Sequence, residues 1–244
     1  MTGVAAQGGR APAALPTDQP VATLILVDIA DGSRLWGYSR FVIGRFDRGA
    51  ISGLRFFKVL GSGHDGGFGL RPSPTRQGLF CVFDQAAAAD AFLDGHPLVE
   101  RYRRHAREFF SVKLHTYSCR GSWSGLSLPT TTTTPVCGPI AALTRASIRP
   151  SRASAFWRKA PPAQADLEHA AGCLLATGLG EAPLLRQATF SLWCDVDDMD
   201  RYARSGAHLE AIKAAHRHGF FSESMFARFV PVGMRGSYKG RVYG

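Results

Sequence analysis

The stretch at residues 78–110, GLFCVFDQAAAADAFLDGHPLVERYRRHAREFF, has a counterpart at residues 189–221, TFSLWCDVDDMDRYARSGAHLEAIKAAHRHGFF. Slid against each other without a gap, the two stretches agree at Asp84/Asp195, Gly95/Gly206, Leu98/Leu209, His105/His216, Phe109/Phe220 and Phe110/Phe221. Farther upstream, residues 61–63 (GSG) face residues 178–180 (GLG) in the same order. Collinear self-similarity of this kind predicts two copies of one structural unit.

Each copy predicts the order β-α-β-β-α-β. In the first copy the expected strands are residues 22–29, 54–60, 78–83 and 110–118, with a helix at 33–45 and a broken helix at 85–93 and 97–108. In the second copy the strands are 140–148, 173–178, 187–194 and 225–232, with helices at 152–158, 196–204 and 207–217. Apolar β-branched runs mark the strands, and apolar residues at helical spacing mark the helices. This order is the ferredoxin-like split βαβ.

The fold class is therefore α+β, with tandem ferredoxin-like repeats forming a barrel of the dimeric α+β type within one chain. The expected parts are a disordered N-terminal tail (1–20), a first repeat (21–125), a linker (126–138), a second repeat (139–232) and a basic C-terminal tail (233–244). Pro129 and Pro135 flank a threonine run, which is typical of an exposed loop. The barrel interior, or the gap between sheet and helices, would then hold an apolar ligand.

Composition limits the class of protein. The chain has 244 residues, of which 45% are hydrophobic and 20% charged, so it can build a core. No stretch approaches the roughly 20 apolar residues that span a bilayer. The cysteines are odd in number, and no two form a CxxC pair; they are Cys81, Cys119, Cys137, Cys173 and Cys194. This pattern argues against a zinc site or a disulfide framework and favours a reducing cytoplasm, with most thiols serving as small core residues.

The net charge of +10 suits nucleic acid, an anionic membrane surface or an acidic protein. No helix-turn-helix, zinc finger or RNP motif occurs, so nucleic acid is the least favoured partner. Residues 61–66, GSGHDG, resemble a phosphate loop, but no helix follows them, and a flexible hairpin loop is the simpler interpretation.

Histidines are the candidates for metal ligation, because imidazole is the usual proximal ligand of haem iron. His208 shares an apolar helical face with Ala211, Ile212 and Ala215, and the small alanines would leave room for a flat macrocycle. His105 and His216 are alternative ligands on similar faces. A histidine on such a face is more often a packed core residue, so both interpretations stay open.

Three further residues are candidates for cofactor binding. Arg120 could pair with a haem propionate, since guanidinium matches carboxylate in a bidentate way, and Trp123 could wall an apolar pocket. The alternative is a glycine-rich turn with a packed tryptophan. Arg145 interrupts an apolar strand and needs a carboxylate, a ligand or solvent.

Several strings resemble those of the bacterial spheroidene monooxygenase family. They are residues 57–63 (FKVLGSG), 120–125 (RGSWSG), 138–146 (GPIAALTRA), 178–185 (GLGEAPLL), 187–193 (QATFSLW) and 221–229 (FSESMFARF). The resemblance spans roughly residues 21–232. It implies a dimeric α+β barrel fold and oxidation of acyclic carotenoids to a C-2 ketone, with O2 and electrons from ferredoxin. It also implies a haem cofactor.

Carried over by position, the resemblance retains His105 and His208 as ligand candidates, because both fall in matching segments. Arg186 departs from the family, which tends to have histidine there. We expect the haem between the second sheet and its last helix, with His208 on iron and Arg120 or Arg145 on the propionates. Two rival functions share the barrel: a cofactor-free monooxygenase of the antibiotic-biosynthesis type, and a non-catalytic barrel that binds haem or another apolar ligand.

Overall fold

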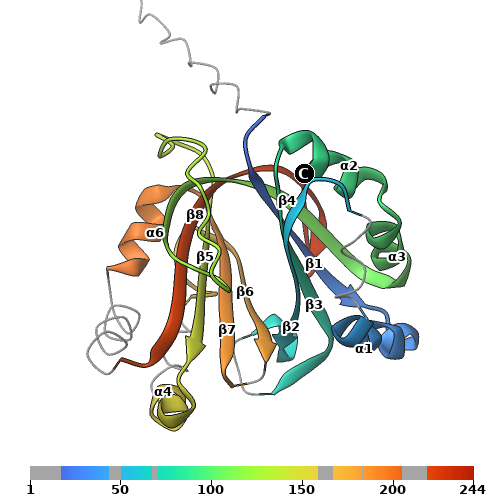
Figure 1. Ribbon diagram of the computed structural model, residues 1–244, viewed down its shortest axis with the longest axis horizontal. Helices are drawn as coiled ribbons and strands as arrows, with labels where there is room; N and C mark the ends of the chain where they lie inside the picture. Colours follow the sequence, from blue (N-terminus) through green and yellow to red (C-terminus); the bar gives the residue numbers. More distant parts are fainter. Residues whose placement is uncertain (1–17, 44–50, 68–70, 159–166, 183, 205–218) are drawn as a thin grey trace, which may run out of the picture.

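A closed barrel of eight antiparallel strands forms the centre of the protein (Figure 1). The computed structural model describes residues 18–43, 51–67, 71–158, 167–182, 184–204 and 219–244. Around the barrel the strands run in the order β4-β1-β3-β2-β6-β7-β5-β8, and β8 pairs back onto β4. Their bounds are β1 (Val21–Ile29), β2 (Leu54–Gly63), β3 (Pro72–Phe83), β4 (Ala106–Gly121), β5 (Ile140–Ile148), β6 (Cys173–Ala182), β7 (Arg186–Trp193) and β8 (Phe221–Tyr238). A short strand, β9 (Arg241–Tyr243), pairs with β8.

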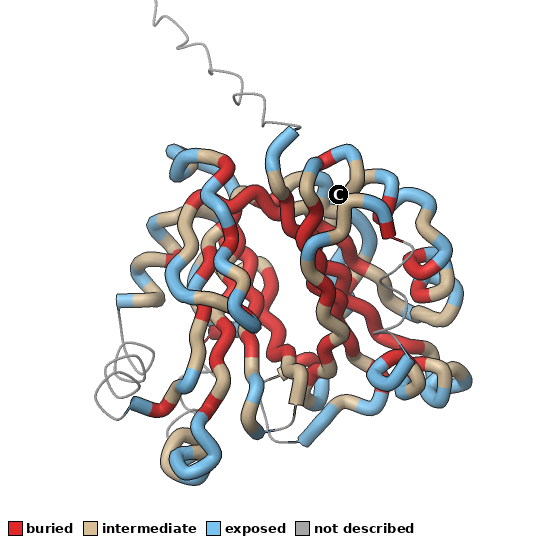
Figure 2. The backbone as a smooth tube through the Cα atoms, in the orientation of Figure 1, coloured by how far each residue is buried: buried red, intermediate tan, exposed pale blue. Residues whose placement is uncertain are grey.

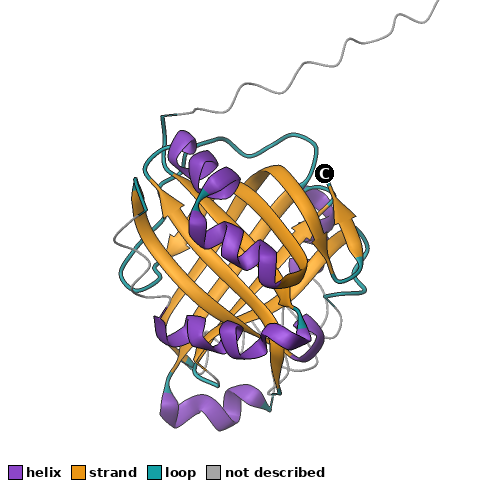
Figure 3. Ribbon diagram, turned by 90° about the vertical axis from the view of Figure 1, so that its right-hand side faces the viewer, coloured by secondary structure: helices purple, strands orange, loops and turns teal. Residues whose placement is uncertain are grey.

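Helices lie outside the barrel (Figures 1 and 3). They are α1 (Arg34–Ile43), α2 (Ala86–Gly95), α3 (Pro97–His105), α4 (Ala153–Trp157) and α6 (Val196–Ala203). The predicted break between α2 and α3 falls at His96, whose Nδ1 accepts the backbone N–H of Leu98. Pro97 supports the break, because it suits the first position of a helix but cannot continue a preceding one. The helix expected at residues 207–217 lies outside the described residues.

Side chains fill the barrel interior. Alternate residues of each strand point inward, so Ala22, Leu24 and Leu26 of β1 join one buried cluster while Ile25 and Val27 face the helices. The inward cluster includes the aromatic residues Phe80, Phe110, Trp123, Phe190 and Phe229. Each fully buried side chain of this size contributes about 1.5–3 kcal/mol. A ligand chamber at the barrel centre, one of the two places we expected, is therefore filled by the protein itself; Figure 2 shows the buried backbone that surrounds it.

The register of the sheet corrects the ungapped repeat. Phe83 lies opposite Val21 at the start of β1, and Trp193 lies opposite Ile140 at the start of β5. Phe83 therefore corresponds to Trp193, one residue away from the match that aligned Asp84 with Asp195. The match between the two glycine strings shifts as well. Gly61, which the sequence aligned with Gly178, pairs directly with Gly180 across the seam between β2 and β6. A shift of one residue moves a strand's side chains to its other face, so sparse identities cannot set the register.

The two long strands β4 and β8 continue into turns of related sequence. Residues 120–126 read RGSWSGL and residues 235–241 read RGSYKGR. In both turns the first glycine has positive φ, +81° at Gly121 and +97° at Gly236. The segment expected as a solvated basic tail is therefore the β8–β9 hairpin, with Tyr238 fully buried.

Two segments expected as exposed loops are each anchored to the barrel at one residue, although most of the threonine linker is exposed as expected. In the linker, Thr131 is buried, and the backbone N–H groups of Thr131 and Thr132 both donate to the carbonyl oxygen of Thr116 on β4. In the glycine-rich string, Ser62 is buried and donates to the carbonyl oxygen of Gly178 at 2.6 Å. The cysteines also differ from the expectation that most are small core residues. Cys81 is buried, but Cys137 and Cys194 are exposed.

We expect Gly236→Ala to destabilise the fold by about 3 kcal/mol, because the new Cβ would overlap the carbonyl oxygen of Phe109. Gly240→Ala is the matched control: it also has positive φ, +71°, but nothing lies near its Cβ position. Its cost should be about 1 kcal/mol. Urea unfolding of both variants measures the difference, and equal midpoints would contradict it.

Candidate functional site

Two of the predicted residues, Trp123 and Arg145, meet at one end of the barrel, here called the Trp123 mouth. The indole Nε1 of Trp123 donates to Oε1 of Glu181 at 2.7 Å, and Nη2 of Arg145 donates to the same oxygen at 2.9 Å. The Arg145 guanidinium also lies 5.7 Å from the Trp123 ring centroid, over its face. Trp123 in turn stacks on Phe80, with ring centroids 5.1 Å apart.

The charges at the Trp123 mouth are balanced. Arg145, only 2% exposed, donates from Nη1 to Glu223 at 2.5 Å, and Lys58 donates to Glu181 at 2.7 Å. Burial opposes ionisation of Glu223, but N–H groups of Gly125 and Ser124, the Ser122 hydroxyl and Arg145 together lower its pKa to about 2. Both carboxylates are thus held ionised, and Arg145 has two protein partners.

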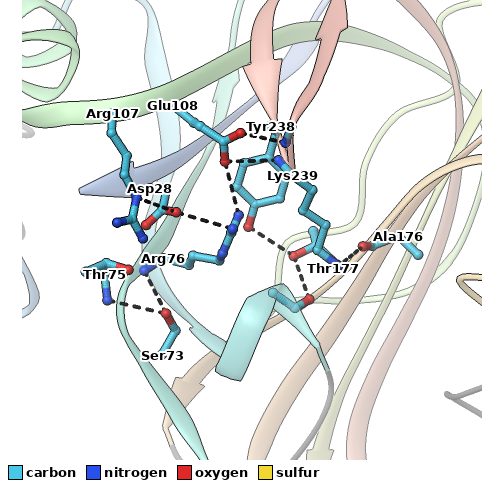
Figure 4. A network of polar contacts seen from close by, with 12 residues as sticks. Asp28, Ser73, Thr75, Arg76, Arg107, Glu108, Ala176, Thr177, Tyr238 and Lys239 are labelled. Carbon is cyan, nitrogen blue, oxygen red and sulfur yellow. Dashed lines mark hydrogen bonds and ion pairs between the residues drawn. The ribbon is translucent and has the colours of Figure 1, made fainter. Parts of the chain in front are cut away.

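The other end of the barrel, the Tyr238 mouth, repeats this arrangement with different residues (Figure 4). The guanidinium of Arg76 lies 5.0 Å from the ring centroid of Tyr238. Glu108 accepts the backbone N–H groups of Lys239 at 3.0 Å and Gly240 at 2.6 Å, as Glu223 accepts that of Gly125 at 3.0 Å. A carboxylate on two successive amides pins each turn in place.

Buried Asp28 adds a further charge at the Tyr238 mouth. It pairs with Arg76 at 3.2 Å and with Arg107 at 2.9 Å. Beside this mouth lies a pocket of about 190 Å³, lined by Glu168, Cys173, Leu174, Leu175, Ala176, Lys239, Arg241 and Tyr243. Lys239 is held there by Glu168 at 2.7 Å and Arg241 by the carbonyl oxygen of Leu174 at 3.0 Å. The pocket's cations therefore already have protein partners.

The predicted cofactor-binding residues do not form one site in the described part of the chain. Arg120 is exposed, while Trp123 and Arg145 point into the barrel. The haem position expected beside the second sheet lies on the other face of that sheet. We expected the Arg145 guanidinium to pair with a haem propionate, but it pairs with the carboxylates of Glu181 and Glu223. These two mouth networks were not found from sequence, although the repeated RGS turn was a signal for them.

Of the candidate iron ligands, only His105 falls within the described residues. Its ring stacks on Trp36 with centroids 4.2 Å apart, and its Nδ1 lies 2.9 Å from the Ser33 hydroxyl. These contacts agree with the alternative in which His105 is a packed core residue. His208 and His216 lie outside the described residues, so His208 stays a prediction. His115 on β4 is buried, which lowers its pKa, and within the described part of the chain its Nδ1 has no hydrogen-bond partner.

The outer faces of the two half-barrels differ in bulk. In the first half Phe57, Val59, Leu79, Cys81 and Ile25 pack against the helices. Their counterparts by sheet register in the second half are Ala176, Gly178, Thr189, Ser191 and Thr144. We call these five second-half residues, with Ala142, the small-residue face. The side chains of the second-half face are therefore smaller than those at the equivalent positions of the first half.

The small-residue face presents backbone and short side chains across β5, β6 and β7, and the buried Trp193 donates from Nε1 to Ser191 on it at 2.9 Å. The chain between α6 and β8, residues 204–220, carries both His208 and His216 in the sequence. Among the described residues, no three His, Cys, Asp or Glu side chains gather as metal ligands. No described helix combines the length and apolar content needed to cross a bilayer.

Comparisons with known proteins place the chain. A solved aldoxime dehydratase in complex with butyraldoxime has a TM-score of 0.59 at 12% identity, covering 91% of this chain and 82% of that one. A second aldoxime dehydratase structure has a TM-score of 0.56, covering 92% and 88%. These likenesses define the fold, a mixed α+β barrel. No model of a known family matches the chain.

The sequence relatives are more specific. The spheroidene monooxygenase of Rubrivivax gelatinosus is 56% identical over 98% of this chain and 96% of its own length. That of Rhodobacter capsulatus is 36% identical, covering 91% of this chain and 94% of its own length. The protein is thus an oxygen-inserting enzyme, a carotenoid monooxygenase. It belongs to the spheroidene monooxygenase family, which confirms the resemblance found in its sequence and disfavours both rival functions.

We expect Glu223→Gln to weaken the loss of folding stability that occurs as the pH falls into the acidic range. Because the pKa of Glu223 in the folded protein, about 2, lies below that of an unfolded glutamate, about 4.3, its ionised form stabilises the fold above the higher value. That contribution disappears as the pH falls from about 4.3 towards 2. Urea midpoints between pH 6 and pH 2 measure it. Asp65→Asn, at an exposed carboxylate, is the control, and parallel acid limbs for Glu223→Gln and the parent would contradict the assignment.

Proposed function

We propose that this protein introduces a keto group at C-2 of an acyclic carotenoid of the spheroidene type. The substrate is the one named for its relatives, and the 56% identity to one of them carries the proposal. We further propose that the enzyme binds haem against the small-residue face, with His208 as the iron ligand. The bulk missing from that face, relative to its first-half equivalent, supports this position.

Bound haem would supply the activation of O2. The chain's own part is to bind, orient and exclude water. The small-residue face leaves room for a planar group, and Trp193 and Met199, both buried beside it, keep water from its edge. Thr144 and Thr189 face each other there and can donate hydrogen bonds from their hydroxyl groups.

The overall reaction balances at one carbon. Two successive hydroxylations of a CH2 group, each using one O2, two electrons and two protons, release two waters and leave a geminal diol. Loss of a third water gives the ketone. The electrons need a one-electron donor, and the net charge of +10 suits an acidic ferredoxin. A cytoplasmic enzyme in peripheral contact with an anionic membrane would reach both donor and substrate.

We also propose that the chain consists of two ferredoxin-like repeats. Each half has the order β-α-β-β-α-β, and the pairing of β1 with β3 corresponds to that of β5 with β7. The related turns at residues 120–126 and 235–241 support duplication independently, since each ends the last long strand of its half.

The proposed function is tested with purified protein. We expect a Soret band that His208→Ala abolishes, because the haem iron would lose the side chain proposed to hold it, together with loss of ketone formation from spheroidene. His64→Ala, at a half-exposed histidine on the opposite half of the barrel, is the matched control and should keep both. A band unchanged in His208→Ala would exclude that ligand, and purified protein with no haem would exclude the cofactor.

Filling the small-residue face should also remove the cofactor. We expect Thr144→Ile with Thr189→Ile to lower haem content at least roughly tenfold while the far-ultraviolet circular dichroism stays unchanged, because added methyl groups occupy the space that haem needs. Thr134→Ile, the same substitution in an exposed part of the linker, should bind haem normally. Full haem content in the double variant would move the cofactor elsewhere.

A further inference from the structure

Helix α1 exposes an apolar face that the fold does not use. Of the large apolar side chains exposed in the described part of the chain, most lie on this one ten-residue helix: Leu35, Tyr38, Phe41, Val42 and Ile43, against Val136, Leu184, Phe226 and Val242 elsewhere. Leu35 is 86% exposed and Val42 64%. Clustering of this kind marks an interaction surface, whereas isolated exposed apolar residues do not.

The opposite side of α1 anchors the helix. Trp36 stacks on His105 and makes an edge contact with Tyr102, with centroids 5.0 Å apart. Gly37 approaches the barrel closely, since a Cβ there would lie 3.0 Å from Nε2 of Gln77. Arg40 is buried on the same side. Phe41 also packs toward the barrel, since a Cβ at Gly61 would lie 3.6 Å from its ring. The most exposed side chains of α1, Leu35 and Val42, take part in none of these contacts.

Basic residues surround this face. Arg34 begins α1 with its side chain 47% exposed, and the contacts of Trp36 and Ser33 with His105 place the end of α3 beside it. There Arg103, Arg104 and Arg107 are all exposed, while Arg34, Arg103 and Arg107 each also pair with a carboxylate, that of Asp31, Glu100 and Asp28 respectively. α1 and α3 lie on the same side of the barrel (Figures 1 and 3). An apolar helix face bordered by arginines complements a bilayer whose headgroups carry phosphate.

We propose that α1 docks the enzyme on an anionic lipid bilayer, with Leu35 and Val42 among the acyl chains, the exposed Arg104 near the phosphates, and the net charge of +10 drawing the protein to the anionic surface. A second copy of the chain fits less well. The exposed face belongs to a single ten-residue helix, whereas a stable dimer buries roughly 800 Å² per partner. The inference rests on the proposed function, because a carotenoid hydrocarbon dissolves in the bilayer and an enzyme that docks there meets it directly.

Co-sedimentation with vesicles tests the proposal. We expect the full chain to bind vesicles of phosphatidylcholine with phosphatidylglycerol, more weakly at high salt and more weakly to phosphatidylcholine alone. Leu35→Glu with Val42→Glu should lower the bound fraction about tenfold or more, since two carboxylates would enter the apolar layer. Val242→Glu changes a valine on β9 that is 85% exposed, about as exposed as Leu35, and should bind like the parent.

The assay contains no carotenoid, oxygen or reductant. Binding to vesicles can therefore fail while the proposed oxidation holds, and binding can succeed while the proposed oxidation fails. Equal binding by the double variant and the parent would overturn the proposal, as would a parent that does not bind vesicles. A change of sedimentation coefficient from dimer to monomer in the double variant would assign the face to a second copy instead. If the double variant unfolds, Leu35→Ser alone replaces it, with a smaller loss of binding expected.

Discussion

The antiparallel pairing of β4 with β8 is the contact on which the rest of the structure depends. It joins the last strand of each half, from Phe110 opposite Gly236 at one end to Gly121 opposite Met225 at the other. Without it, the sheet would open along this seam, expose its inner face and leave the edges of β4 and β8 unpaired. Closure explains why β4 and β8, at 16 and 18 residues, are the longest strands: each must cross the whole barrel wall and then turn over its mouth.

Closure also accounts for the charged networks at the two mouths. A turn folded across a barrel end must satisfy its own backbone amides away from bulk water, and a carboxylate from the start of the partner strand does this at each end. Glu223 and Glu108 need a cation in turn, which Arg145 supplies from β5 and Arg76 from β3. Removing one member would leave its partner's charge unpaired, so these residues stabilise the turns that close the barrel ends.

Sequence predicted the strands and the order of elements well, because apolar runs and glycine breaks are local signals. It predicted the register poorly, since the match of Asp84 with Asp195 rests on identity and ignores which face each side chain occupies. The mouths could not be predicted, because Trp123, Arg145 and Glu181 come from three separate elements and meet only when the barrel closes. Arg145 shows the limit plainly: its need for a partner was visible in the strand, but Glu181 and Glu223 were not.

The outer faces of the two halves differ in how they are packed. In the first, Ile25 and Leu79 are large and share one buried cluster with residues of α2 and α3. In the second, Thr144 and Thr189 stand at the same positions and contribute shorter side chains. Because the pairing of β4 with β8 holds both halves in one closed sheet, the packing outside one half can differ from that outside the other without loss of the fold.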